Sequence, residues 1–304
     1  MKPKIKVTVG LCVKNSEESI EEALRSIFEQ DFPKELMEII VVEGYSRDRT
    51  LSIIRRMLPK SNIFYKIFRE EKGLGYARQI VVDNSVGDYI IWVDGDMILP
   101  KNFIRKQVEF MELNPDVGIA KGKYGPFKQR SLVASLEDLE FVIAFERERE
   151  VLFEPLGASG CIYRTKAIKQ VGGFDANFEG VGEDMDVEYK IRVAGWRLCI
   201  SSASFYEKRR ATWQTLWKEY LWHGMGGYRF FKKYNKVANS FAIFPPILLL
   251  KKFIQIARAY KIVRQKRVIL LPIHYIFKRT AWIFGFLREF LNNKRLRSTR
   301  IETA

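Results

Sequence analysis

Residues 88–96 read Asp88-Tyr89-Ile90-Ile91-Trp92-Val93-Asp94-Gly95-Asp96, an apolar strand pattern that ends in two acidic residues. Ligands of open α/β sheets bind outside the carboxyl ends of the strands. Two carboxylates at such an end are favourable when a cation lies between them and a phosphate, because hard cations such as Mg²⁺ take oxygen ligands. The stretch therefore indicates a buried parallel strand that leads into a metal and phosphate site. Taken alone, a pair of aspartates that only caps a turn is an equally good interpretation.

The composition indicates a folded chain with two electrostatically different parts. Of the 304 residues 47% are hydrophobic, which is enough to bury a core. Residues 1–207 carry 30 Lys and Arg against 33 Asp and Glu, whereas residues 208–304 carry 22 against 3. The net charge of +16 therefore comes from the last third, and we expect the two parts to meet different surroundings.

The cysteines and the N-terminus indicate a reducing compartment. Cys12, Cys161 and Cys199 are odd in number and widely spaced, which argues against a disulfide framework and against a structural zinc site. We expect them to be small core residues. The first residues enter a strand pattern directly, without the apolar stretch of a signal peptide.

Strand and helix patterns alternate along the first part of the chain. Buried apolar strands that alternate with amphipathic helices predict a doubly wound, mostly parallel α/β sheet with helices on both faces. The middle of the chain is mixed, with a flexible turn at 157–160. The expected strands are 5–13, 38–42, 63–68, 88–93 and 161–163, and the expected helices are 15–30, 51–57, 73–84, 102–113, 135–150 and 182–194.

Four motifs follow one another in order around this sheet. Glu43 ends the second strand, and Lys72-Gly73-Leu74-Gly75-Tyr76-Ala77-Arg78 is a glycine turn flanked by cations. Asp94-Gly95-Asp96 comes next, and Gly182-Glu183-Asp184-Met185-Asp186 then opens a helix. In this order, over roughly residues 5–232, the chain resembles the family-2 glycosyltransferases of the GT-A fold.

The resemblance implies an inverting transfer of a sugar from a nucleotide-diphosphate donor to a hydroxyl or phosphate acceptor, with Mn²⁺ or Mg²⁺ as the cofactor. A metal would stabilise the charge of the diphosphate leaving group as a Lewis acid. A single carboxylate would take the proton of the acceptor hydroxyl, and a helix N-terminus favours the ionised form of such a group. The expected residues are Asp184 with Glu183 for catalysis, Asp96 with Asp94 for the metal, and Val13, Lys14, Glu43, Lys72, Arg78 and Asp94 for the donor.

The chain departs from the family pattern at three places. Relatives often read Asp-Asp-Gly-Ser where this chain has Glu43-Gly44-Tyr45-Ser46, and Pro-Thr-Tyr where it has Cys12-Val13-Lys14. In the family the equivalent of Glu43 accepts hydrogen bonds from the nucleotide base. Because Glu is longer than the usual Asp, the sequence does not indicate which nucleotide is bound. Where many relatives carry a His after the last strand, this chain has Phe205-Tyr206-Glu207. A third metal ligand would therefore be Glu207, Tyr206 or water.

The last third predicts association with an anionic membrane surface. Its two apolar runs, 241–250 and 268–291, are interrupted by basic pairs, and neither reaches the roughly 20 apolar residues of a clean span. We expect residues 1–232 to form the catalytic domain. Residues 233–304 would form a helical, basic, amphipathic region, peripheral or monotopic at the cytoplasmic membrane face. The cationic surface would comprise Lys251, Lys252, Arg258, Lys261, Arg264, Lys266 and Arg267.

Membrane placement would bring the catalytic domain to a lipid-linked acceptor such as a polyprenyl phosphate, which the resemblance alone suggests. A soluble helical subdomain or a dimer interface is the alternative for this region, and the sequence does not indicate an oligomeric state. Arg210, Trp213 and Trp222 are candidates for the acceptor side. The tryptophans recur at near-helical spacing, which core or membrane-interface packing also explains.

Two other classes of protein share some of these features. A nucleotidyltransferase also uses paired aspartates and Mg²⁺, but residues 10–20 lack the glycine-rich basic loop that we would expect. A non-catalytic protein could use the basic last third to bind nucleic acid or anionic lipid. The complete acidic set in the nearly neutral first part disfavours that interpretation, and we expect no nucleic-acid partner.

Overall fold

The computed structural model describes residues 4–152, 155–176, 178, 180–235, 256, 260–261 and 264–302, with side chains as far as residue 293. Contacts divide the chain into two compact units. The first comprises Met1–Pro126 and Phe145–Lys208, and the second comprises Phe127–Ala144 and Arg209–Ala304. The apolar run 241–250, Lys251, Lys252 and Arg258 of the predicted membrane region lie outside the described residues.

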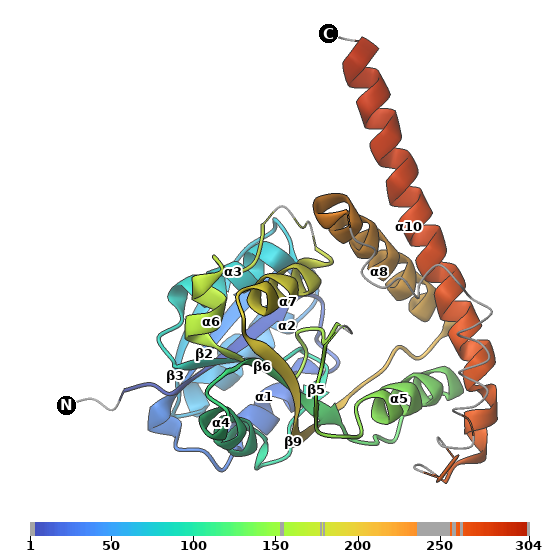
Figure 1. The fold of residues 1–304 in the computed structure, drawn as a ribbon. Helices are drawn as coiled ribbons and strands as arrows, with labels where there is room; N and C mark the ends of the chain where they lie inside the picture. The colour runs from blue at the N-terminus through green and yellow to red at the C-terminus, as the bar shows by residue number, and fades with distance from the viewer. Residues whose placement is uncertain are drawn as a thin grey trace. The chain divides into compact units, whose positions relative to one another are not determined.

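Four parallel strands form the N-terminal half of the sheet in the first unit (Figure 1). Their order is β3-β2-β1-β4, and each neighbouring pair is parallel. The apolar runs of the sequence become these strands because both faces of the sheet are covered, which requires nearly continuous hydrophobic residues. The strands are β1 Val7–Val13, β2 Met37–Glu43, β3 Phe64–Arg69 and β4 Tyr89–Trp92.

The other half of the sheet is mixed. Strand β8 pairs antiparallel with both β4 and β6, and β6 pairs parallel with β9. The short strands β5 and β7 both add to β9 in the antiparallel sense. These strands are β5 Met97–Ile98, β6 Val117–Tyr124, β7 Arg149–Glu150, β8 Cys161–Arg164 and β9 Arg197–Glu207.

Helices cover both faces of this sheet, as predicted. Ile40 and Val42 of β2 share a buried cluster with residues of α3, α6 and α7. Successive side chains of a strand alternate between faces, so Ile39 and Val41 face the other side. The helices of this unit are α1 Ile20–Phe28, α2 Thr50–Met57, α3 Leu74–Asn84, α4 Phe103–Leu113, α6 Thr165–Gln170 and α7 Glu183–Val193, with short 3₁₀ turns η1 Lys34–Leu36 and η2 Leu58–Lys60.

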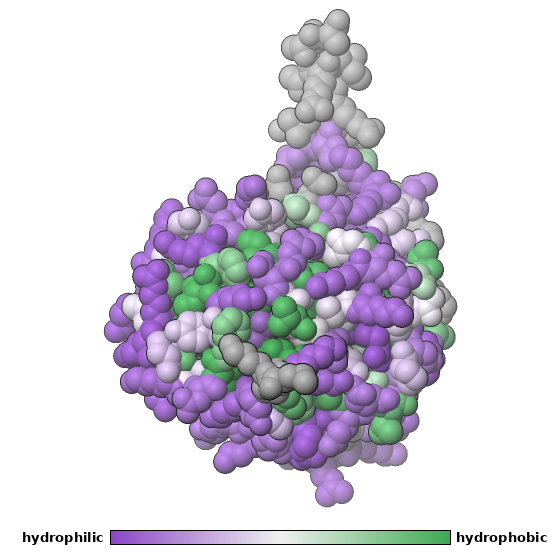
Figure 2. All heavy atoms as spheres, turned by 90° about the vertical axis from the view of Figure 1, so that its left-hand side faces the viewer, coloured by the Kyte–Doolittle hydropathy of each residue, from purple (hydrophilic) through white to green (hydrophobic). Residues whose placement is uncertain are grey.

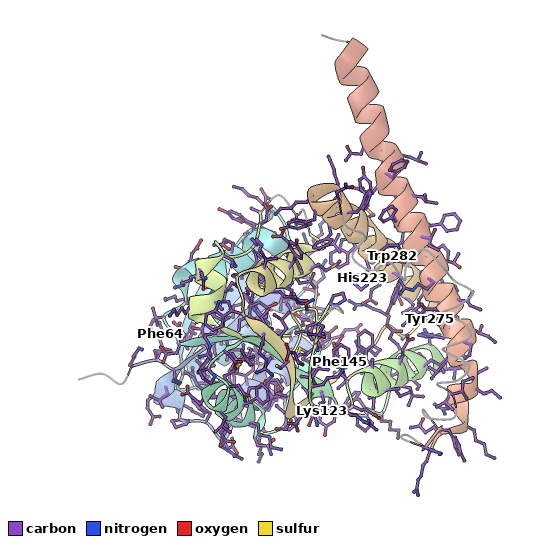
Figure 3. The ribbon with its side chains drawn as sticks, viewed as in Figure 1. Phe64, Lys123, Phe145, His223, Tyr275 and Trp282 are labelled. Carbon is purple, nitrogen blue, oxygen red and sulfur yellow. The ribbon has the colours of Figure 1, made fainter. Side chains whose placement is uncertain are left out.

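The β3 edge of the sheet carries one prominent exposed aromatic side chain, Phe64, which is 58% exposed (Figure 3). Figure 2 shows a face of the molecule on which hydrophilic residues surround smaller groups of apolar ones. Single exposed apolar side chains are common on folded proteins. Lys66 and Arg69 of the same strand add charge that discourages pairing with another chain.

The second unit consists of helices that pack through glycines. A Cβ atom at Gly285 of α10 would lie 1.9 Å from the carbonyl oxygen of Leu221 in α8, and one at Gly224 of α8 would lie 2.0 Å from that of Trp282. Figure 3 labels Trp282 on α10 and His223 on α8. The two helices therefore touch at their backbones. The elements are α5 Leu132–Ala144, α8 Trp213–Tyr234, η4 Lys266–Leu270 and α10 Leu271–Glu302.

One expectation about this region differs from the structure. The helix predicted over 135–150 ends at Ala144, because Arg149 and Glu150 form β7 and pair with Ile200 and Cys199 of β9. The second compact unit contains α5 and the residues from Arg209 onward, and α8 packs on α10 within it. The functional division at 232 stays a prediction. Cys161 and Cys199 are buried, as expected of core residues, whereas Cys12 is only partly buried.

Candidate active site

The sheet has a topological switch point between β1 and β4. The chain moves outward from β1 to β2 and β3, and then returns to β4 on the other side of β1. Crevices at such points bind ligands in open α/β sheets. Asp94 and Asp96 follow β4 here, and Gly95 between them packs on the end of β1, since a Cβ atom at Gly95 would lie 3.1 Å from Val13 Cγ1. The predicted acidic pair therefore lies at this switch point of the sheet.

Arg78 of α3 lies at the centre of the predicted site. Its side chain is buried, and its guanidinium forms an ion pair with Glu183 at the start of α7. Burial lowers the pKa of Arg78, but the carboxylates of Glu183, Asp94 and Asp184 outweigh this and raise it. Arg78 therefore stays charged. The structure thus brings together four residues that the sequence predicted from three separate motifs.

The carboxylate of Glu183 forms a buried ion pair with Arg78. Burial raises the pKa of Glu183 to about 7, against the lowering effect of the Arg78 guanidinium. The side chain is 2% exposed, so the ion pair is shielded from water. Removing one partner of such a pair leaves an uncompensated buried charge. The contact indicates that Glu183 holds Arg78 in place, and a direct catalytic role for Glu183 stays a prediction.

Asp184, the predicted base, lies in the first turn of α7 and is half-buried. Its Oδ1 accepts a hydrogen bond from the backbone N–H of Met185 at 2.8 Å. Its Oδ2 faces the turn at Gly157, where a Cβ atom would lie 3.8 Å away. One carboxylate oxygen is thus fixed by the helix terminus, and the other lies beside the turn at Gly157.

The predicted base-binding acid, Glu43, is buried and has protein donors on both oxygens. Oε1 accepts the N–H of Ser46 at 2.5 Å, and Oε2 accepts from Arg69 Nε at 2.9 Å. Burial raises the pKa of Glu43, but these hydrogen bonds outweigh it and lower the pKa. Arg69 in turn lies 4.0 Å from the ring centre of Tyr45. The sequence did not point to Arg69, and contact of Glu43 with a nucleotide stays a prediction.

The other predicted donor residues flank the same strand ends. Val13 is paired with Glu43 across β1 and β2, and the Lys14 side chain lies against Gly44. Lys72 is exposed, with its ammonium 4.6 Å from the ring centre of Tyr76. Its donor role stays a prediction.

The residues at the end of β4 fit a divalent cation. Asp94 and Asp96 are half-buried and offer hard carboxylate oxygens, the type of ligand that Mg²⁺ and Mn²⁺ prefer. Asp94 Oδ2 accepts a hydrogen bond from Ser159 Oγ, which orients that carboxylate. Pairing of β5 with β9 sets Glu207 opposite Met97, the residue after Asp96, and the Asp96 carbonyl accepts the Lys208 N–H at 3.0 Å. The suggested third ligand is therefore close in the fold to the acidic pair.

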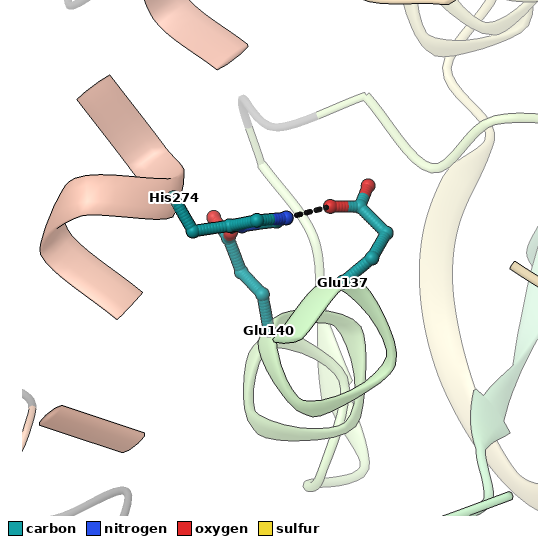
Figure 4. A group of neighbouring side chains, drawn as sticks. All are labelled: Glu137, Glu140 and His274. Atoms are coloured by element: carbon teal, nitrogen blue, oxygen red, sulfur yellow. Dashed lines mark ion pairs between the residues drawn. The ribbon is translucent and has the colours of Figure 1, made fainter. Parts of the chain in front are cut away.

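A second group of potential metal ligands lies in the other unit. Glu137 and Glu140 of α5 face His274 of α10 (Figure 4). Lys278, however, places its ammonium 2.7 Å from Glu137 Oε2 and 2.8 Å from Glu140 Oε2. The ammonium of Lys278 thus already neutralises the two carboxylates, in the place that a metal ion would take. We interpret the group as a buried ion-pair cluster that joins α5 to α10.

The three acceptor-side candidates all belong to the second unit. Trp213 packs edge-on against Phe277 of α10, with ring centres 4.7 Å apart. Trp222 is 39% exposed, and Arg210 pairs with Glu219 at 3.3 Å. The contact of Trp213 agrees with the helix-packing alternative for the tryptophans. Acceptor binding by Arg210, Trp213 and Trp222 stays a prediction.

The sequence also did not point to the residues that shape the turn at 157–160. The turn is held by Lys121 of β6, which donates to the Ser159 carbonyl, and by Glu188 of α7, which accepts the Leu156 N–H. From the turn, Ser159 Oγ donates to Asp94. The strand that carries Lys121 was not predicted, so the sequence contained no signal that this lysine is buried.

A doubly wound sheet with carboxylates and a buried arginine at its switch point is typical of enzymes that act on phosphorylated or nucleotide substrates. Comparison with known proteins narrows this class. A sequence model of glycosyl transferase family 2 matches residues 8–171, which is more than half of the chain. The chain belongs to this family and is a glycosyltransferase.

Two relatives from Staphylococcus aureus are similar in sequence. Poly(ribitol-phosphate) beta-N-acetylglucosaminyltransferase TarS of strain Mu50 / ATCC 700699 is 31% identical over 121 residues, which cover 39% of this chain and 21% of that protein. Poly-beta-1,6-N-acetyl-D-glucosamine synthase of strain COL is 22% identical over 234 residues, which cover 73% of this chain and 54% of that protein. The chain thus spans between about a fifth and about half of these relatives.

Solved structures share the fold. Mannosyltransferase PcManGT from Pyrobaculum calidifontis, in complex with GDP-Man and Mn²⁺, aligns with a TM-score of 0.67 at 18% identity, covering 95% of this chain and 88% of that one. S. aureus TarS 1-349 in complex with UDP aligns with a TM-score of 0.55 at 20% identity, covering 93% and 89%. The predicted GT-A fold is confirmed.

Proposed function

We propose that this glycosyltransferase moves a sugar from a nucleotide-diphosphate-sugar donor to a hydroxyl or phosphate acceptor, with inversion at the anomeric carbon. The observation that carries the proposal is the buried Arg78, which pairs with Glu183 and lies within the electrostatic influence of the half-buried Asp94 and Asp184. The similar structures bound to UDP and to GDP-Man support a nucleotide donor.

Arg78 is suited to a diphosphate. It stays charged, and Glu183 fixes its position before any ligand binds. A guanidinium that is already desolvated and oriented interacts strongly with phosphate oxygens and needs no reorganisation. Val13, Lys14, Glu43 and Lys72 would complete the donor site at the ends of β1, β2 and β3.

Asp94 and Asp96 would hold a divalent cation. The complex of the similar mannosyltransferase with Mn²⁺ supports this assignment. When bound, the cation supplies Lewis-acid stabilisation of the diphosphate leaving group. Ser159 would keep the Asp94 carboxylate oriented through their hydrogen bond.

Asp184 would act as the catalytic base. Its Oδ1 is held by the Met185 N–H, while its Oδ2 faces Gly157. Asp184 lies in the first turn of α7, and anions are favoured near helix N-termini. Removal of the acceptor proton by one carboxylate opposite the leaving group gives a single displacement, and hence inversion.

Product analysis with Asp96→Asn and Asp184→Asn tests these assignments. A screen of UDP-sugars and GDP-sugars should give free nucleoside diphosphate, whereas a nucleotidyltransferase would release pyrophosphate. EDTA should abolish transfer and Mn²⁺ or Mg²⁺ should restore it. We expect Asp96→Asn to weaken metal-dependent nucleotide binding, and Asp184→Asn to retain binding while turnover falls roughly 10²-fold or more. Full activity in chelator would refute the metal assignment, and wild-type turnover of Asp184→Asn would refute the base.

The second unit supports docking on an anionic membrane. Ile273, Ile276, Phe284, Leu287 and Leu291 of α10 are each between 45% and 62% exposed. At 100° per residue they fall within an arc of about 80°, so they form one apolar stripe, in which Thr280 is a polar interruption. Within the ranges described above, no helix combines the length and the apolar composition needed to cross a membrane. We therefore propose that α10 lies on the membrane through this stripe.

Basic residues accompany the apolar stripe. Lys266, Arg267 and Arg288 are exposed, and 22 Lys and Arg stand against 3 acids in residues 208–304. Each basic residue near an anionic leaflet contributes about 1 kcal/mol. A chain bound in this way at the cytoplasmic face would meet a lipid-linked acceptor, for example a polyprenyl phosphate.

Vesicle flotation with the full chain tests the docking surface. The wild type should float with vesicles that contain anionic lipid. A variant with Ile276→Asp and Leu287→Asp should stay at the bottom of the gradient, because charge on the stripe prevents its burial. The matched control is Leu113→Asp, on an 81% exposed residue of α4. If the doubly charged variant floats like the wild type, the stripe is not the docking surface.

A further inference from the structure

We propose that Lys121 is a positioning residue of the donor and metal site, which acts on Asp94 through the turn at residues 157–160. The proposal rests on the donor and metal site proposed above. It concerns a strand residue that touches neither Asp94 nor Asp96 in any described contact, and whose effect is carried by Ser159.

Lys121 is a buried lysine that donates two hydrogen bonds to this turn and also interacts with Tyr124 of its own strand. It is 1% exposed. Its Nζ donates to the carbonyl oxygen of Ser159 at 2.7 Å and to that of Gly157 at 3.3 Å. Burial lowers its pKa, but nearby groups led by Tyr124 outweigh this and raise it, so Lys121 remains a cation. Burying a charge is unfavourable unless it is paired or fully hydrogen-bonded. The two carbonyl groups are therefore held firmly to Lys121.

The rings around Lys121 restrict it further. Its ammonium lies 5.1 Å from the ring centre of Tyr124 and 5.4 Å from that of Phe145. Aromatic faces attract a cation at such distances. The ammonium thus has one well-defined position. The carbonyl groups of Gly157 and Ser159, which it binds, are therefore restricted in position as well.

A second element holds the same turn from the other end. Glu188 of α7 is buried, and its Oε2 accepts the backbone N–H of Leu156 at 2.9 Å. Gly157 and Gly160 adopt φ angles of +69° and +67°, a conformation that other residues rarely adopt. The turn is therefore a fixed structure between β6 and α7.

The turn in its fixed position reaches both halves of the proposed site. Ser159 Oγ donates to Asp94 Oδ2, and Gly157 faces Asp184 Oδ2. A Cβ atom at Gly157 would be within 4 Å of both Asp184 Oδ2 and Lys121 Nζ. Displacement of the turn would remove the hydrogen bond that orients the Asp94 carboxylate. Lys121 therefore sets the geometry of a ligand that it does not touch.

Calorimetry of UDP and GDP with Mn²⁺ provides the test. Lys121→Met and Ser159→Ala should each weaken metal-dependent nucleotide binding roughly tenfold, as expected for a lost charge-assisted hydrogen bond. Because both variants act through the same contact, the double variant should bind no more weakly than either single one. Lys123→Met, on the same strand but partly exposed and paired with Glu148, is the control and should bind like the wild type.

Independent tenfold losses that multiply in the double variant would overturn the proposal, as would wild-type affinity of Lys121→Met. Should Lys121→Met not fold, Lys121→Gln replaces it; its amide can still donate to one carbonyl, so a partial loss is expected.

Amide hydrogen exchange of the protein without nucleotide gives a second, ligand-free readout. The Gly160 N–H bonds to the Trp92 carbonyl, and the Cys161 N–H bonds to that of Ala158, both at 3.0 Å. Exchange at these two amides should accelerate in Lys121→Met but not in Lys123→Met. Unchanged exchange would refute the role of Lys121 in the turn. If exchange accelerates but the wild-type protein binds neither nucleotide, the proposed donor site is wrong while the fixing of the turn stands.

Discussion

Replacing Glu188 by Gln should change how the stability of this protein depends on pH. Burial, followed by the nearby Asp184 carboxylate, raises the pKa of Glu188 to about 8 from an ordinary value of 4.5. The folded protein therefore binds a proton here that the unfolded chain releases between those values. Folded-state stability consequently falls as the pH rises through this window. Gln has the same shape and can still accept the Leu156 N–H, but it does not titrate.

The size of the effect follows from the pKa difference. One pKa unit corresponds to about 1.4 kcal/mol, so ionising Glu188 costs the wild type about 2 kcal/mol of stability between pH 6 and pH 8. Glu188→Gln should therefore gain about 2 kcal/mol relative to the wild type over the same interval. Glu183, whose pKa is about 7, contributes to both proteins, so its effect cancels in the comparison.

Urea unfolding at pH 6 and pH 8, followed by tryptophan fluorescence, measures this difference. Glu35→Gln is the control, because Glu35 is an exposed carboxylate on η1 and its replacement should have the same effect at both pH values. An equal stability difference between Glu188→Gln and the wild type at pH 6 and pH 8 would show that Glu188 is ionised throughout, and would refute the reasoning.

Two further predictions concern the second unit. Lys278→Met should destabilise the fold by about 3–5 kcal/mol in urea unfolding, because Glu137 and Glu140 lose the ammonium between them; a loss under 1 kcal/mol would mean that water or another cation replaces it. Gly285→Ala should lower stability by about 1–3 kcal/mol or more, because the new methyl group would lie 1.9 Å from the Leu221 carbonyl oxygen and push α8 from α10. Thr280→Ala on the partly exposed side of α10 is the control for the second change, and an unchanged melting temperature of Gly285→Ala would contradict the close helix contact.

The sequence predicted β1 to β4 and β8, which are mostly apolar or aromatic, and missed β5, β6, β7 and β9. β6 reads Val117-Gly118-Ile119-Ala120-Lys121-Gly122-Lys123-Tyr124, where glycine and lysine interrupt the pattern of a strand. Gly118 and Gly122 are required by packing, since Cβ atoms there would lie 2.7 Å from Trp196 and 2.8 Å from Phe103. That requirement depends on tertiary contacts, which a local pattern does not contain.

The same distinction applies to the site. Arg78, Asp94, Glu183 and Asp184 belong to motifs that are legible in the sequence, and the structure brings them together. Lys121 is 38 residues from Ser159, and Ser159 is 65 residues from Asp94. Arg69 reaches Glu43 only through the pairing of β3 with β2. Residues that act by holding others become visible only when the strands are assembled.

The ion-pair cluster of α5 and α10 has a consequence for how the chain is made. Lys278 lies 141 residues after Glu137, so the ribosome releases α5 long before the cation that neutralises it. The residues of the first unit are complete once Lys208 has emerged, whereas α5, which interrupts that unit in sequence, has to wait. During this interval Glu137 and Glu140 lack the ammonium of Lys278. The apolar side chains of Leu136 and Leu139 also lack the residues of the later chain that they pack against in the folded protein. Nascent chains that end before Lys278 therefore expose acidic and apolar side chains of α5, and transiently exposed apolar surface favours aggregation.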